Sequence, residues 1–275
     1  MSLFTVLGAT GFIGRHLAEY LRGQGHSVYL PERDCPHLRG KPLGHVIYCI
    51  GTTGNFRQNP QAAVDAHVNK LYSLMEGAEF DSWLYLSSTR VYGGLHATAR
   101  ANEETPLPLL PSSDKIYDLT KLLGEAICLG KECATIRVAR LSNVYGVGQS
   151  PSTFLGAIQQ DLARAGSVII GESPLSQKDY LSIKDAVFFL SQIALNGKER
   201  LYNVASGQSV SHEQLAAALR KCGKSVEFSK EGALRRFPEV DIARLSAEFG
   251  CPQQNILQEI PEILSGFPSR ELRME

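Results

Sequence analysis

Tyr117 and Lys121 are the first two side chains whose types and spacing predict chemistry. They lie four residues apart in the segment YDLTK, and on a helix this spacing places the phenol and the ammonium on one face. A neighbouring lysine cation favours the phenolate, so we expect it to lower the pKa of the tyrosine towards neutral pH. The pair is therefore predicted to act as a general acid and base. The same spacing occurs on many solvated helices, so the prediction depends on the surrounding elements.

Two further hydroxyl groups, Ser87 and Ser88, follow an apolar run at residues 83–86. In a doubly wound sheet, ligands bind beyond the carboxyl ends of the strands. We predict that Ser88 donates a hydrogen bond to a substrate oxygen whose bond order changes. The alternative is that both serines only cap a turn.

A glycine-rich turn lies near the start of the chain, where GATGFIG at 8–14 follows an apolar run at 3–7 and precedes a helical pattern. Such glycines let the backbone approach a pyrophosphate and let the helix pack closely on the sheet. The helix N-terminus adds free N–H donors and a positive dipole. We predict a dinucleotide site here, with a merely structural tight turn as the alternative. The predicted contacts are Gly8, Thr10, Gly11, Phe12, Ile13 and Gly14.

The end of the second predicted strand bears on the choice of dinucleotide. It reads LPERD at 30–34, with proline directly after the apolar run and then Arg33. An acidic side chain favours NAD at this point, whereas a guanidinium accommodates the 2′-phosphate of NADP. Arg33 therefore favours NADP over NAD. The alternative is that Arg33 pairs with Glu32 or Asp34 on a solvated loop.

The elements that must position these residues alternate between strand and helix patterns. Near-continuous apolar strands separated by helices are typical of a parallel sheet covered on both faces. We therefore predict an α/β fold with a Rossmann-like, doubly wound parallel sheet. The expected strands are 3–7, 28–30, 46–50, 83–86 and 135–138, and 61–78 and 115–129 are among the helix-like stretches between them.

The pattern is less regular beyond residue 150. We expect residues 1–150, with about 176–204, to form the dinucleotide-binding domain. Residues 151–175 and 205–275 are expected to form a smaller, interleaved substrate-binding lobe. The helices predicted in this half are 153–164, 183–196, 212–221, 242–249 and 256–264, and the strands are 168–170 and 202–205.

Composition excludes several classes of protein. The chain has 275 residues, and its 28 Lys and Arg balance its 28 Asp and Glu, which argues against a general nucleic-acid binder. No apolar run is long enough to span a membrane, and the N-terminus does not resemble a secretion signal, so a cytoplasmic location is expected. The six cysteines show no metal-ligand spacing, so no metal site is predicted.

Ordered segments along the chain together resemble the extended short-chain dehydrogenase/reductases, specifically the nucleotide-sugar epimerase/dehydratase group. The resemblance covers nearly the whole chain. The segments that carry it are GATGFIG at 8–14, SSTRVYG at 87–93, YDLTK at 117–121, RLSNVYGVGQ at 140–149, QKDYLSIKDAV at 177–187, YNVASGQSVS at 202–211 and DIARLSAEFG at 241–250.

This resemblance implies roles for individual residues. Ser88, Tyr117 and Lys121 would be the catalytic triad, with Lys121 also bonding the nicotinamide ribose. Gly51 would lie against the cofactor, and Asn143 would line the substrate site. Members of the group bind a nucleoside diphosphate sugar and move a hydride between the sugar and C4 of the nicotinamide.

The chain departs from the group at informative positions. Dehydratases carry an Asp-Glu pair directly after the catalytic hydroxyl, and Thr89 and Arg90 stand there instead, which argues against a 4,6-dehydratase. Thr89 is still expected to contact the substrate. Lys178 stands where the group has an arginine that binds the diphosphate. A lysine keeps the positive charge but cannot form the bidentate contact of an arginine. The residues expected at the second diphosphate contact are Arg235 and Arg236.

His67 stands where the group usually has a structural asparagine. It either replaces the hydrogen bond of that asparagine or is a core histidine.

The leading hypothesis is an NAD(P)-dependent epimerase that acts on a nucleotide-linked sugar through a transient ketone. The alternative within the group is an NADPH-dependent keto-sugar reductase, which Arg33 favours. A second class is a non-catalytic NAD(P) sensor or scaffold, although such proteins typically lose the tyrosine or the lysine. A homodimer is also expected from the group.

Overall fold

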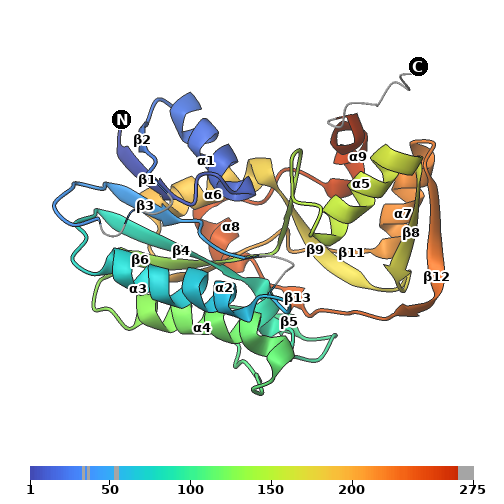
Figure 1. Ribbon diagram of the computed structural model, residues 1–275, viewed down its shortest axis with the longest axis horizontal. Helices are drawn as coiled ribbons and strands as arrows, with labels where there is room; N and C mark the ends of the chain where they lie inside the picture. The colour runs from blue at the N-terminus through green and yellow to red at the C-terminus, as the bar shows by residue number, and fades with distance from the viewer. Residues whose placement is uncertain (33–34, 36–37, 53–55, 266–275) are drawn as a thin grey trace.

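A parallel six-stranded sheet forms the centre of the protein in a computed structural model that describes residues 1–32, 35, 38–52 and 56–265 (Figure 1). All its strand pairings are parallel. This confirms the predicted Rossmann-like α/β fold. In spatial order the strands are β10 (Leu201–Val204), β6 (Ile136–Leu141), β4 (Ser82–Ser88), β3 (His45–Tyr48), β1 (Leu3–Leu7) and β2 (Ser27–Tyr29).

Helices cover both faces of this sheet (Figure 1). On one face α1 (Phe12–Gly23) packs beside α6 (Ile183–Asn196), and on the other lie α3 (Lys70–Met75) and α4 (Ile116–Leu129). Successive residues of a strand point to opposite faces. Leu84 and Leu86 of β4 accordingly join the first core, and Trp83 and Tyr85 join the second. Burial on both faces explains the continuous apolar runs in the sequence.

The strand order reverses beside β1. From β1 the chain passes to β2 on one side and then crosses back to β3 on the other. Ligands of doubly wound sheets bind at the carboxyl ends of the strands at such a switch point. The glycine-rich turn follows β1 at this point, so the topology places it where a dinucleotide site is expected.

A second group of elements packs around its own apolar core. Strand β8 (Ser167–Glu172) pairs in parallel with β12 (Ser225–Ala233), and β9 (Gln177–Ser182) lies between β7 (Asn143–Tyr145) and β11 (Ser209–Ser211). The helices around this core are α5 (Phe154–Ala165), α7 (His212–Lys221) and α9 (Ile256–Ser265). Strands β9, β11 and β12 were not predicted, because polar residues dominate them and tertiary contacts decide their state.

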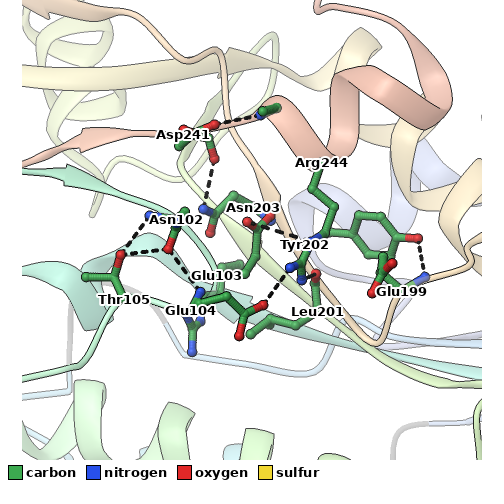
Figure 2. Close-up of polar contacts among 12 residues, drawn as sticks. Asn102, Glu103, Glu104, Thr105, Glu199, Leu201, Tyr202, Asn203, Asp241 and Arg244 are labelled. Atoms are coloured by element: carbon green, nitrogen blue, oxygen red, sulfur yellow. Dashed lines mark hydrogen bonds and ion pairs between the residues drawn. The ribbon is translucent and has the colours of Figure 1, made fainter.

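Short elements connect this region to the edge of the central sheet. Strand β5 (Arg100–Ala101) pairs with β13 (Glu239–Val240), and α8 (Ala243–Phe249) packs beside β10. Figure 2 shows Asn203 of β10 between Glu103 and Asp241. Its backbone N–H donates to the Glu103 carboxylate at 2.7 Å, and its side-chain amide donates to the Asp241 backbone carbonyl at 2.9 Å. These bonds join three distant segments of the chain.

The helix predicted over 61–78 is interrupted. It begins as α2 (Pro60–Val64), passes through a π-helical segment at Asp65–Asn69 and continues as α3. Such insertions are rare and occur frequently at functional sites. Here the π-helical segment carries His67, which is fully buried beneath α4. No helix in the described ranges has the length and apolar character needed to cross a membrane.

Candidate active site

Ser88, Tyr117 and Lys121 meet where β4 ends. Ser88 is the last residue of β4, and Tyr117 and Lys121 lie one turn apart on α4, which packs on that strand. All three are buried, and the Ser88 hydroxyl lies close enough to Tyr117 to lower its pKa, although burial raises it by more. The ammonium of Lys121 lies 6.0 Å from the centroid of the Tyr117 ring. The structure thus brings together the three residues predicted to be catalytic.

Burial raises the pKa of Tyr117 above its usual value. The nearby Ser88 hydroxyl and the positive charge of Arg90 lower it, but by less than burial raises it. The expected lowering of this pKa by Lys121 is therefore wrong for the protein by itself, since desolvation disfavours the phenolate more strongly. Tyr117 rests as a neutral phenol that can donate a proton.

Lys121 is buried and donates a hydrogen bond to the backbone carbonyl of Leu86 at 2.7 Å. Burial lowers its pKa to about 7, although the negative charge of Glu125 and the thiol of Cys49 act in the opposite direction. Gly51 lies directly beside it: a Cβ atom added to Gly51 would be 3.5 Å from the Lys121 Nζ. The ammonium therefore lies next to the backbone that follows β3.

An ion pair is buried behind Lys121. Arg140 of β6 donates hydrogen bonds to both carboxylate oxygens of Glu125, with the shortest contact at 2.7 Å, and Ser87 donates to the same carboxylate. Arg140 also donates to the Tyr92 hydroxyl at 2.8 Å, which donates to the side chain of Asn203 at 2.8 Å. This network links the region behind the site to the contacts of Asn203 in Figure 2.

His67 packs against the ring of Tyr117. Its ring contacts the Tyr117 ring edge to face, with centroids 5.2 Å apart at 89°. The backbone N–H of Thr52 donates to His67 Nε2 at 3.4 Å, so Nδ1 carries the proton and donates to Thr120 Oγ1 at 2.9 Å. Thr120 in turn donates to the Tyr117 carbonyl. His67 is thus both a core residue and a hydrogen-bonded link, and burial lowers its pKa to about 2.

The glycine turn after β1 has the geometry that a dinucleotide requires. Gly8 has φ +84°, and a Cβ atom on Gly14 would lie 2.3 Å from the Gly8 carbonyl oxygen, so neither position accepts a larger residue without rearrangement. Gly11 caps α1 without a side-chain bond, which leaves the first N–H groups of Phe12 and Ile13 free for phosphate oxygens. Thr10 is exposed beside them. These residues fit a dinucleotide cofactor, whereas Arg33 lies outside the described residues.

The predicted substrate residues lie mainly on the second group of elements. Lys178 of β9 forms an ion pair with Glu172 at 3.0 Å, and Arg235 approaches the same carboxylate at 3.4 Å. Asn143 donates to the Asp179 carbonyl at 2.8 Å. Arg236 is exposed and makes no hydrogen bond or ion pair within the described residues. The structure therefore brings Lys178 and Arg235 together but not Arg236.

The residues around Lys178 include three that were not predicted. Its ammonium lies 3.7 Å from the centroid of the Phe154 ring, on which His212 stacks at 4.4 Å. His212 is fully buried, and its Nε2 lies 3.7 Å from the carboxylate of Glu172. Burial and the nearby ammonium lower its pKa to about 4. Glu172, Phe154 and His212 come from three separate elements, so no sequence spacing could have grouped them.

Thr89 and Arg90 begin the 3-10 turn that follows Ser88. Arg90 donates through Nε to the buried carboxylate of Asp118 at 3.2 Å, and Lys115 pairs with the second oxygen at 3.3 Å. The Arg90 guanidinium lies 5.2 Å from the ring centroid of Tyr117. Within the described part of the chain, no cluster of histidine, cysteine and carboxylate side chains could hold a metal ion.

Comparison with known protein families assigns the chain to one of them. The family model for the NAD dependent epimerase/dehydratase family matches residues 4–53 and 38–205. The chain therefore belongs to the NAD dependent epimerase/dehydratase family. A search of curated proteins found no match.

Solved structures with the same fold share little sequence with the chain. MoeE5, solved with UDP-glucuronic acid and NAD, has a TM-score of 0.80 at 22% identity, over 96% of this chain and 98% of that one. RMD from Pseudomonas aeruginosa, solved with NADPH, has a TM-score of 0.78 at 23% identity, over 97% and 98%. TunA, an NAD-dependent NDP-hexosamine 5,6-dehydratase, has a TM-score of 0.82 at 20% identity, over 99% of both chains. At these identities the likeness shows the fold alone.

Proposed function

We propose that the protein is an NAD(P)-dependent epimerase that inverts a carbinol carbon of a nucleotide-linked sugar through a transient ketone. The observation that carries this proposal is the meeting of Ser88, Tyr117 and Lys121 at the carboxyl end of β4. Retention of all three argues against a non-catalytic sensor or scaffold.

The cofactor would lie between the glycine turn and Lys121. The turn at 8–14 would hold the pyrophosphate, and Gly51 and Lys121 would lie against the nicotinamide ribose. When bound, the dinucleotide supplies a hydride acceptor that can return the hydride to the sugar. The preference for NADP through Arg33 remains a prediction.

Tyr117 would exchange the proton of the reacting sugar hydroxyl. In its phenolate form Tyr117 would take this proton while the same carbon gives up a hydride, and a ketone would form. Ser88 donates a hydrogen bond to the oxygen throughout. After the keto sugar rotates in the site, the hydride would return to the opposite face of its carbonyl carbon, and Tyr117 would give the proton back. Burial raises the pKa of Tyr117, and the positive charge of Arg90 acts against it and favours the phenolate that the first step needs.

The nucleoside diphosphate would lie on the second group of elements. Lys178 and Arg235 supply positive charge for the diphosphate, and Asn143 and Thr89 would contact the sugar. The complexes of MoeE5 with UDP-glucuronic acid and with UDP-glucose support this choice of substrate class.

A keto-sugar reductase is the second candidate. The resemblance to RMD, which was solved with NADPH, favours it. A reductase would release its cofactor after each cycle, whereas an epimerase would retain it.

The homodimer also remains a prediction, which gel filtration tests. The division of the chain remains a prediction as well: residues 1–150 with 176–204 would form the dinucleotide-binding domain, and residues 151–175 with 205–275 would form the substrate-binding lobe.

The test begins with the nucleotide that copurifies with the protein. The released nucleotide is identified by mass. Turnover of UDP-sugars and GDP-sugars is then followed in the wild type, in Tyr117→Phe and in Tyr72→Phe, which is a control at an exposed tyrosine. We expect retained NAD(P) and a loss of about 10² to 10⁴ in kcat only in Tyr117→Phe. Equal turnover in all three proteins would overturn the proposed role of Tyr117. An empty site that prefers NADPH would favour the reductase.

A further inference from the structure

Arg90 is held in place by three contacts that leave part of its guanidinium available. Its Nε donates to Asp118 at 3.2 Å. Its guanidinium carbon lies 5.2 Å from the ring centroids of both Tyr117 and Phe56. Among the described residues, no hydrogen bond is made by the terminal nitrogens Nη1 and Nη2. The side chain keeps 41% of its surface exposed, so these two donors can reach a ligand.

Positive charge exceeds negative charge around this group. Asp118 is the only carboxylate that pairs with Arg90 within the described residues, and Lys115 pairs with it as well. Arg90 also lies close enough to Lys178 to lower the pKa of that lysine, although burial is the larger cause. Arg90 therefore lies within electrostatic range of the second group of elements, which carries Lys178. One positive charge remains uncompensated beside Tyr117.

We propose that Arg90 binds a carboxylate on the sugar ring itself, so that the substrate is a nucleotide-linked uronic acid. The inference rests on the proposed function, because it takes Tyr117 and Ser88 to bind the reacting hydroxyl. A planar guanidinium with two parallel N–H donors matches a carboxylate in a bidentate arrangement.

The position of Arg90 decides which part of the substrate it meets. Arg90 lies two residues after Ser88, and its backbone N–H donates to the Ser88 hydroxyl at 3.3 Å. It also contacts the ring of Tyr117, so a group that reaches Arg90 must be a substituent near the reacting carbon. The diphosphate is directed to Lys178 and Arg235, which are held around Glu172. The two anionic parts of the substrate therefore have separate partners.

The discriminating experiment compares matched charged and neutral ligands. Binding to the protein as purified is measured by calorimetry for UDP-glucuronic acid against UDP-glucose, for GDP-mannuronic acid against GDP-mannose, and for UDP and GDP alone. The wild type should bind one of the uronates at least about tenfold more tightly than its neutral partner. In Arg90→Gln this ratio should fall to about one, while the affinity for the nucleoside diphosphate stays unchanged.

Arg57 provides a matched control. Its guanidinium lies 4.8 Å from the centroid of the same Phe56 ring, and it pairs with Asp114 at 2.7 Å. Arg57→Gln should keep the full preference for the uronate. Arg90→Lys, which keeps the charge but not the planar donors, should keep an intermediate preference, and it guards against misfolding of the glutamine variant.

Several outcomes would overturn the inference. Equal affinity of the wild type for charged and neutral sugars would refute the uronate assignment and leave the proposed function standing. An unchanged preference for the uronate in Arg90→Gln would refute the contact between Arg90 and the carboxylate. Failure to bind any nucleotide sugar or nucleoside diphosphate would overturn the proposed function together with this inference.

Discussion

The ammonium of Lys121 donates a hydrogen bond to the backbone carbonyl of Leu86 at 2.7 Å. Leu86 lies two residues before Ser88 on β4, whereas Lys121 lies on α4 one turn after Tyr117. One hydrogen bond therefore fixes the helix that carries the predicted acid and base against the strand that carries the predicted hydroxyl. The bond also places a buried cation next to Gly51.

This buried cation should make stability depend on pH. Burial lowers the pKa of Lys121 from 10.5 to about 7. Below pH 7 the lysine is protonated in both states, and the full cost of burying the charge is present. Between pH 7 and 10.5 only the unfolded state keeps the proton, so the stability of the folded protein rises with pH.

Replacement of Lys121 by methionine removes this dependence. Relative to Lys121→Met, the nucleotide-free wild type should gain about 1.4 kcal/mol of unfolding free energy per pH unit above pH 7. Urea unfolding at pH 7, 8 and 9 measures the difference. Lys230→Met, an exposed substitution on β12, should show no such trend. A constant difference between the wild type and Lys121→Met would contradict the lowered pKa.

His67 should act through its hydrogen bonds and not through its charge. His67→Leu would leave the Thr52 N–H and the Thr120 hydroxyl without this partner and should cost about 1–3 kcal/mol of unfolding free energy. His67→Asn, which can retain one of these bonds, should cost less. Because the pKa of His67 is lowered to about 2, turnover of His67→Asn should keep the inflections of the wild type between pH 5 and 8. Disappearance of an inflection would show that His67 titrates in this range.

Glu172 should weaken the binding of nucleoside diphosphates. Its carboxylate pairs with Lys178 and Arg235, so a bound diphosphate must compete with it. Glu172→Gln should therefore bind UDP or GDP more tightly, by roughly tenfold or ~1.4 kcal/mol. Calorimetry at pH 6 is suitable, because burial lowers the pKa of Lys178 and Glu172 opposes this, so that the loss of Glu172 favours the neutral amine. The exposed control Glu227→Gln should change nothing, and weaker binding by Glu172→Gln would refute the competition.

The ion pair between Glu125 and Arg140 should be sensitive to the loss of one partner. Both side chains are almost fully buried, at 4% and 5% exposure. Arg140→Met leaves the Glu125 carboxylate buried without its partner and should cost about 3–5 kcal/mol. The double variant with Glu125→Leu should be more stable than Arg140→Met alone. Chemical denaturation measures both, and equal stability of the two variants would show that the pair is not coupled.

Local patterns were sufficient to predict much of the central fold. The apolar run Leu3–Leu7, the glycine turn and the helical pattern after it form β1 and α1 as expected. Buried parallel strands need apolar residues on both faces, so their signal is contained in the sequence itself. The predicted helices at 183–196 and 212–221 also agree with α6 and α7. By contrast, the π-helical segment around His67 has no local pattern that predicts it.

We could predict the parallel sheet, the glycine turn and the grouping of Tyr117 with Lys121 from the sequence, because each has a signal in residues close together in the chain. The tertiary structure, by contrast, was needed to show that burial raises the Tyr117 pKa and that Glu172 pairs with Lys178 and Arg235. It also decided that the Arg90 guanidinium lies across the Tyr117 ring. Desolvation and charge pairing depend on which distant segments pack together, and that information is not contained in any local spacing.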